Sequence, residues 1–106
     1  AALANAMPGH IRFDANEQDS LTYAAAEKIY IKGRMEEAKT SFNKYLQTFP
    51  EGAFSLNAHY YLCLIGNEQK NYDMVLLHSD KLLEYPNNPF AEEALILRAE
   101  VQWSIG

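Results

Sequence analysis

Apolar side chains recur along this chain at intervals of three and four residues, and Pro and Gly residues separate the apolar stretches. The separating residues are Pro8, Gly9, Gly33, Pro50, Gly52, Pro86 and Pro89. Residues three and four apart lie on one side of a helix, so the pattern predicts helices over 21–32, 35–49, 54–66, 72–84 and 90–105. Asp19 or Ser20 is expected to cap the first helix. The chain is therefore predicted to be all-α.

The sequence also contains an internal repeat. A shift of 36 residues, the separation of Pro50 and Pro86, brings residues 50–54 onto 86–90 and Ala58 onto Ala94. A single short helix pair cannot bury its own apolar sides, so such pairs stack on one another, with small residues where two helices touch closely. We therefore expect antiparallel helix pairs that stack one upon the next.

The order of small and large residues resembles the tetratricopeptide repeat. In the first unit the matching positions are Thr22, Ala25, Ala26, Ile29, Ala38, Phe42, Tyr45 and Pro50. In the second they are His59, Leu62, Cys63, Gly66, Val75, Ser79, Leu82 and Pro86, and the third supplies Leu95, Arg98, Ala99 and Gln102. Ser79 stands where the family has an aromatic residue, and Arg98 stands where it prefers an apolar one. The resemblance implies a short right-handed α-solenoid of stacked helix–turn–helix repeats.

The same resemblance implies the domain organisation. An N-terminal tail at 1–19 would precede a repeat domain at 20–106, with repeats at 20–50 and 53–86 and a half repeat or capping helix at 90–105. Trp103 and Ile105 place apolar side chains in that last helix, so we expect this chain to come from a longer repeat array.

One subgroup of the family is more similar than the rest. The run at 32–39 and the terminators Phe49-Pro50 and Tyr85-Pro86 resemble repeats of bacterial envelope proteins, such as the Tol–Pal coordinator and outer-membrane assembly lipoproteins. This resemblance implies a periplasmic or outer-membrane-associated protein. The cytoplasm stays the alternative, because a lone Cys63 allows either compartment.

In such arrays the first helix of each pair lines a concave face that is offered to a partner. Counted from the small packing positions Ala26, Cys63 and Ala99, the resemblance implies a partner-binding face of eleven residues. They are Tyr23, Glu27, Tyr30, Asn57, Tyr60, Leu64, Asn67, Glu93, Ile96, Glu100 and Trp103. Aromatic side chains give large, rigid contact areas and amides bond a peptide backbone, so a protein or peptide segment is the expected ligand. Tyr at helical spacing also serves packing, so only a minority of these residues is expected to contact a partner.

Composition narrows the classes of partner. The formal net charge of −5 opposes nucleic acid, which proteins grip with clustered Lys and Arg. No run of about 18 apolar residues exists, so no membrane insertion is expected.

The sequence also lacks the motifs of common catalytic and metal sites. His10, His59 and His78 lack metal-ligand spacing, and we expect them at the surface or in interhelical packing. Cys63 at a close-packing position predicts a buried, inert thiol. No catalytic residue, metal site or cofactor is predicted.

These observations predict a non-catalytic scaffold for protein–protein interaction. Two alternatives stay open. The repeats could mediate self-association through exposed apolar ends, or they could be a helical-repeat domain attached to an enzyme.

Overall fold

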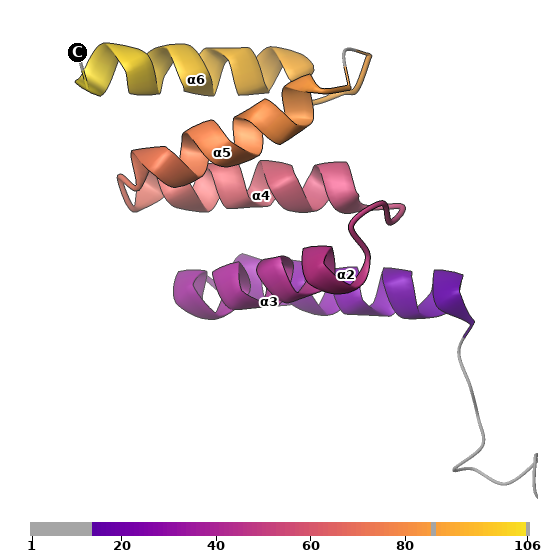
Figure 1. Cartoon of the computed structure of the whole chain (residues 1–106). Helices are drawn as coiled ribbons and strands as arrows, with labels where there is room; N and C mark the ends of the chain where they lie inside the picture. Colours follow the sequence, from indigo (N-terminus) through magenta and orange to yellow (C-terminus); the bar gives the residue numbers. More distant parts are fainter. Residues whose placement is uncertain (1–13, 86, 106) are drawn as a thin grey trace, which may run out of the picture.

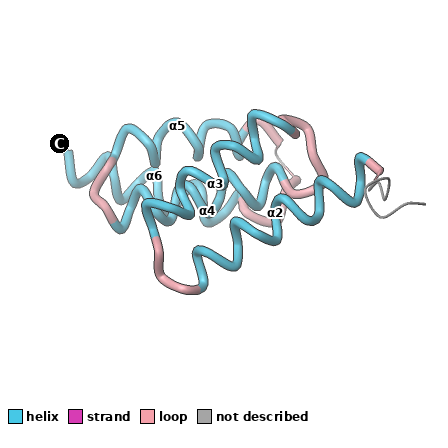
Figure 2. The backbone as a smooth tube through the Cα atoms, turned by 90° about the horizontal axis from the view of Figure 1, so that it is seen from below, coloured by secondary structure: helices cyan, strands magenta, loops and turns pink. Residues whose placement is uncertain are grey.

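The structure is a computed structural model that describes residues 14–85 and 87–105. These residues form the helices α2 (Ala15–Ile31), α3 (Met35–Thr48), α4 (Ser55–Glu68), α5 (Tyr72–Leu83) and α6 (Ala91–Ile105), joined by short loops and without a strand among them (Figures 1 and 2). The predicted all-α class is confirmed. Residues 1–13, which make up most of the predicted tail, lie outside the described residues.

The first helix begins earlier than the sequence pattern predicts. It starts at Ala15 rather than at residue 21, and its N-cap is Asp14, whose Oδ1 accepts a hydrogen bond of 2.8 Å from the amide of Glu17. Asp19 and Ser20, the predicted caps, are therefore inside the helix. The prediction was wrong because the first two turns carry mainly polar side chains, which gave no apolar periodicity to detect.

The chain reverses direction at each connection, and successive helices pack against each other from α2 to α6 (Figure 1). Helices α2 and α3 form one layer, α4 and α5 lie next to it, and α6 packs on both α4 and α5 at the other end of the stack. Gly33 allows the tight turn between α2 and α3, since its φ of 80° is a conformation that favours glycine.

The apolar core consists of two clusters of buried side chains. The first cluster is formed by Tyr23, Ala26, Ala38, Phe42, Tyr45, Ala58, Leu62 and Ile65. The second is formed by Cys63, Val75, Leu82, Ala94, Leu97 and Val101. Both clusters include residues of α4, so α4 is the element that connects the two halves of the core.

Small residues lie in close helix contacts at two of the three predicted packing positions, Ala26 and Cys63. Ala26 and Ala38 are fully buried in the contact between α2 and α3, and Cys63 is fully buried in the contact between α4 and α5. Ala99, the third predicted packing position, is exposed instead. The apolar side of α6 that packs on its neighbours carries Ala94 rather than Ala99.

Candidate functional site

The residues predicted to form a partner-binding face divide into a buried group and an accessible group. Tyr23 belongs to the buried group, with 6% of its surface exposed. Its ring stacks on Phe54 with centroids 4.5 Å apart and planes inclined by 6°. Phe54 precedes α4 in the chain, so Tyr23 contributes to the contact between the two helix pairs.

Glu27 of the predicted face links α2 to α4 by hydrogen bonds. Its Oε2 accepts from the hydroxyl of Tyr23 at 3.0 Å and from the hydroxyl of Tyr61 at 2.7 Å. Burial, together with this carboxylate, raises the pKa of Tyr61 to about 12. Burial also raises the pKa of Tyr23, and Asn57 opposes that shift. Glu27 therefore fixes the orientation of two aromatic rings.

Tyr30 and Tyr60 are half-buried and form the accessible aromatic part of the face. The ring of Tyr30 lies 4.6 Å from that of Tyr61, and the ring of Tyr60 stacks on Phe90 at 4.8 Å with an inclination of 17°. Burial raises the pKa of both hydroxyls, and the second contribution comes from nearby acidic side chains, Glu68 for Tyr30 and Glu93 for Tyr60. This part of the face is therefore both aromatic and acidic.

The remaining predicted residues are less closely grouped. Asn57 is half-buried near Tyr23, and Leu64 packs against the second core cluster. The exposed residues of the predicted face are Asn67, Glu93, Ile96, Glu100 and Trp103, with 89% of Trp103 exposed. The structure thus brings together the predicted residues of α2 and the first half of α4, and it places those of α6 on an open helix surface.

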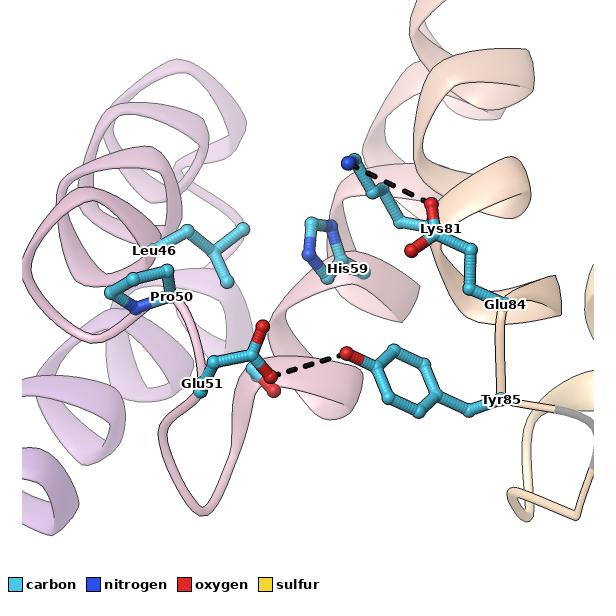
Figure 3. Close-up of a pocket in the computed structure, with 8 residues that line it drawn as sticks. Leu46, Pro50, Glu51, His59, Lys81, Glu84 and Tyr85 are labelled. Atoms are coloured by element: carbon cyan, nitrogen blue, oxygen red, sulfur yellow. Dashed lines mark hydrogen bonds and ion pairs between the residues drawn. The ribbon is translucent and has the colours of Figure 1, made fainter.

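Sequence reasoning missed a cleft between the end of α3, the start of α4 and the end of α5 (Figure 3). Its volume is about 210 Å³, and it is lined by Leu46, Pro50, Glu51, Ser55, His59, Lys81, Glu84 and Tyr85. The hydroxyl of Tyr85 donates to Glu51 across the opening at 3.1 Å, and Lys81 pairs with Glu84 at 3.7 Å. Pockets for small organic ligands are usually larger, about 300–1,000 Å³. The cleft therefore offers little room for such a ligand.

His59 reaches this cleft from α4 and meets His78 of α5, with 2.9 Å between their Nδ1 atoms. The predicted interhelical packing of these two histidines is confirmed, whereas His10 lies outside the described residues. Burial, with smaller contributions from the nearby His59 and Lys81, lowers the pKa of His78 to about 4. Burial is also the main cause of the lowered pKa of His59. Both rings are therefore neutral near pH 7.

Buried Asp19 forms a polar network that the sequence did not reveal. Its Oδ1 accepts from the hydroxyl of Tyr45, and its Oδ2 accepts from the amide of Ala53 at 2.8 Å. The same Tyr45 hydroxyl accepts from the amide of Phe54 at 3.0 Å. These bonds join α2, α3 and the turn before α4, so they hold α2, the helix that carries Tyr23 and Tyr30, in place.

Cys63 lies between α4 and α5, where the sequence predicts a buried thiol. It is fully buried, its Sγ contacts the carbonyl oxygen of Val75 at 3.8 Å, and burial raises its pKa to about 12. The thiol therefore stays protonated at neutral pH, which is the unreactive form. Among the residues that the structure describes, no three His, Cys, Asp or Glu side chains converge as a metal site would require.

Comparisons with protein-family models, with curated proteins and with solved structures found no match to this chain. None of the helices in the described part of the chain has the length and apolar character needed to cross a membrane.

Proposed function

We propose that this chain is a non-catalytic scaffold that binds a peptide or protein segment on the face formed by α2, α4 and α6. The observation that carries this proposal is the pair Tyr30 and Tyr60, two partly exposed rings that are each fixed against another ring. Exposed aromatic side chains with few accessible rotamers are typical of residues that dominate protein interfaces.

The rigidity of these rings has a structural cause. Tyr30 rests on Tyr61, and the Tyr61 hydroxyl is held by Glu27 from the neighbouring helix. Tyr60 rests on Phe90, whose amide is fixed by Asn88 at 2.7 Å. A partner that binds to rings already held in place loses little side-chain entropy at the interface, which favours affinity.

The arrangement as a right-handed solenoid of tetratricopeptide type, with repeats at 20–50, 53–86 and 90–105, belongs to the same proposal. It is supported by contacts that recur along the chain. Phe54 stacks on Tyr23 and Phe90 stacks on Tyr60, so the turn that ends each helix pair places a Phe on a Tyr from the first helix of that pair, α2 or α4. The resemblance of residues 32–39 to envelope proteins extends the proposal to a periplasmic or outer-membrane-associated location.

A selection experiment with peptides of random sequence tests the binding face. The peptides would be displayed on phage and selected on the immobilised chain, and the affinities of enriched peptides would be measured by calorimetry. We expect Tyr30→Ala combined with Tyr60→Ala to weaken binding at least about thirtyfold, since interface hot spots contribute about 2 kcal/mol or more. Tyr23 is unsuitable for this test because its truncation would leave a cavity in the core.

Tyr85→Ala is the matched control, because Tyr85 is an exposed tyrosine at the cleft on the other side of α4. Circular dichroism must show the same helicity in all variants. The proposal fails if no peptide is enriched, or if the enriched peptides bind the double variant as tightly as the original chain.

A further inference from the structure

Helix α6 has apolar side chains on two opposite sides. One side is buried, with Ala94, Leu97 and Val101 in the second core cluster. The other side, which we name the outer face of α6, consists of Leu95, Ile96, Ala99 and Trp103. Leu95, Ala99 and Trp103 follow at intervals of four residues, so they form one stripe along the helix. Exposed fractions of 56% for Leu95, 47% for Ile96 and 89% for Trp103 mean that this stripe is open.

The equivalent side of α4 is covered by a helix. The shift of 36 residues that places Ala58 on Ala94 places Cys63 on Ala99 and His59 on Leu95. Cys63 contacts Val75 of α5, and His59 contacts His78 of α5. Helix α5 covers this side of α4. The equivalent side of α6 is open, and α6 lies at the end of the stack of described helices (Figure 1).

The charges beside the outer face indicate what would cover it. Glu92 and Glu100 lie one turn before and one turn after Ile96, and both are exposed. Among the described residues neither takes part in an ion pair. Arg98 is the only basic residue of α6, and it is already paired with Asp80 of α5. The surface thus combines an apolar stripe with unpaired negative charge.

We propose that the outer face of α6 binds an amphipathic helix of a partner protein, in the position that α5 occupies on α4, and that Lys or Arg side chains flank the apolar stripe of this helix. The apolar stripe of the partner would cover Leu95, Ala99 and Trp103. Its basic side chains would meet Glu92 and Glu100, which supplies charge complementarity at the edge of the contact.

A second copy of this chain fits the same surface less well. Two α6 helices packed through their outer faces would bring Glu92 and Glu100 of both chains together, and like charges at a contact oppose association. The only basic residue of each α6 would remain engaged with its own Asp80. The charge pattern therefore favours a basic partner helix over self-association.

Trp103 is the only tryptophan of the chain and reports directly on this surface. Two synthetic helical peptides of fifteen residues, the length of α6, would carry the same leucine stripe and no tryptophan, flanked by Lys in one and by Glu in the other. Titration into the full chain would be followed by tryptophan emission. We expect the Lys-flanked peptide to shift the emission to shorter wavelength and to bind at least about tenfold more tightly than the Glu-flanked peptide, with an affinity that falls as salt is added.

Ala99→Arg tests the location of the contact, since it places a cation in the middle of the exposed stripe and alters no buried residue. We expect it to weaken binding of the Lys-flanked peptide about tenfold, whereas Gln47→Arg on the exposed surface of α3 should leave binding unchanged. The proposal would be overturned if the chain bound neither peptide or bound both with equal affinity. It would also be overturned if Ala99→Arg bound the Lys-flanked peptide as tightly as the unmodified chain does. A dimer, measured by sedimentation of the unmodified chain, that Ala99→Arg dissociates would overturn it as well. Tyr30 and Tyr60 are unchanged in these variants, so failure of this proposal and failure of the tyrosine-centred peptide-binding site give different results, although Ile96, Glu100 and Trp103 belong to both surfaces.

Discussion

The turn from α3 to α4 and the turn from α5 to α6 occupy equivalent places in the chain, yet different side chains satisfy their backbone amides. In the first turn, Asp19 accepts from the amide of Ala53, and Tyr45 accepts from the amide of Phe54. In the second turn, a single residue does this locally. Asn88 accepts from the amide of Phe90 at 2.7 Å and donates to the carbonyl oxygen of Leu82 at 2.7 Å.

The two solutions depend on complementary substitutions. In the turns, a shift of 36 residues places Gly52 on Asn88. Between the first and the second helix pair the shift is 37 residues, and it places Asp19 on Leu56 and Tyr45 on Leu82. A Cβ atom on Gly52 would lie 2.5 Å from the Tyr45 hydroxyl and 2.8 Å from the Asp19 carboxylate. The first turn must therefore have glycine where the second has asparagine. The backbone groups of equivalent turns can thus find their hydrogen-bond partners either in polar side chains distant in sequence or in one local side chain.

The substitution expected to change the stability most is Gly52→Ala. The added methyl would collide with Tyr45, Asp19 and the Cβ of Phe49, which belong to packed or hydrogen-bonded parts of the turn. We expect the free energy of unfolding to fall by about 3 kcal/mol, measured by urea unfolding followed with circular dichroism. Gln47→Ala, on the exposed surface of α3, should change it by less than about 0.5 kcal/mol.

The same variant can be measured in an Asp19→Leu, Tyr45→Leu background, which copies the residues of the second turn. Because the two polar groups that crowd residue 52 are then absent, the additional cost of Gly52→Ala should shrink to about 1 kcal/mol. An undiminished cost would show that the clash with Phe49 or the backbone, rather than the polar network, requires glycine.

A second test concerns His78 of α5, which belongs to the second helix pair, whereas α2 and α3 of the first pair contain no histidine. His78 is 8% exposed and has a folded pKa of about 4, below the unfolded value of about 6.5. The unfolded chain therefore binds a proton that the folded chain excludes, so stability present above pH 6.5 is lost as the pH falls towards 4. We expect a loss of about 2 kcal/mol by pH 4.5, measured by urea unfolding at each pH.

His78→Leu should remove most of this pH dependence between pH 7 and pH 5, where Asp and Glu protonate little. His59, whose pKa is also lowered by burial, is unchanged in that variant and accounts for the remaining pH dependence. If the free energy of unfolding of this variant fell with pH as steeply as that of the unmodified chain, a group other than His78 would take up the proton on unfolding.

The smallest expected effect is that of Asn88→Ala. This change removes the local partner of the Phe90 amide and of the Leu82 carbonyl, but Asn88 is half-exposed and water can replace part of the lost bonding. We expect a destabilisation of about 1 kcal/mol. Asn87→Ala is the matched control at an exposed neighbour, and a larger effect there than at Asn88 would contradict the local role assigned to Asn88.

Much of the fold could be predicted from apolar spacing, since burial of one helix side imposes that spacing. Ala26, Ala38 and Phe42 lie within helices that this spacing predicts, and they are fully buried. The position of Asp19 could not be predicted, because its hydrogen-bond partners lie 26 and 34 residues away and the sequence alone does not specify such a contact. A buried carboxylate in a polar stretch gives the same local pattern as a solvated one.

The candidate face illustrates the same limit. The resemblance gave Tyr23 and Tyr30 the same expected role, since both lie on the same side of α2. Phe54, which comes from the turn before α4, covers Tyr23 and leaves Tyr30 accessible. Which of two equivalent rings is free thus depends on a residue outside the helix pair, and helical periodicity contains no information about it.

The sharing of α4 between both core clusters has a consequence for how the chain unfolds. The first cluster contains no residue of α6, so detachment of α6 removes none of its contacts. Within the described helices, opening of α6 is then a separate event of low free energy, so amide protons of α6 exchange with solvent through it. Amide protons of α2 and α3 exchange only when the whole structure unfolds. A partner helix bound to the outer face of α6 would slow this local exchange. The amide protons of α6 would then exchange at rates closer to those of α2 and α3.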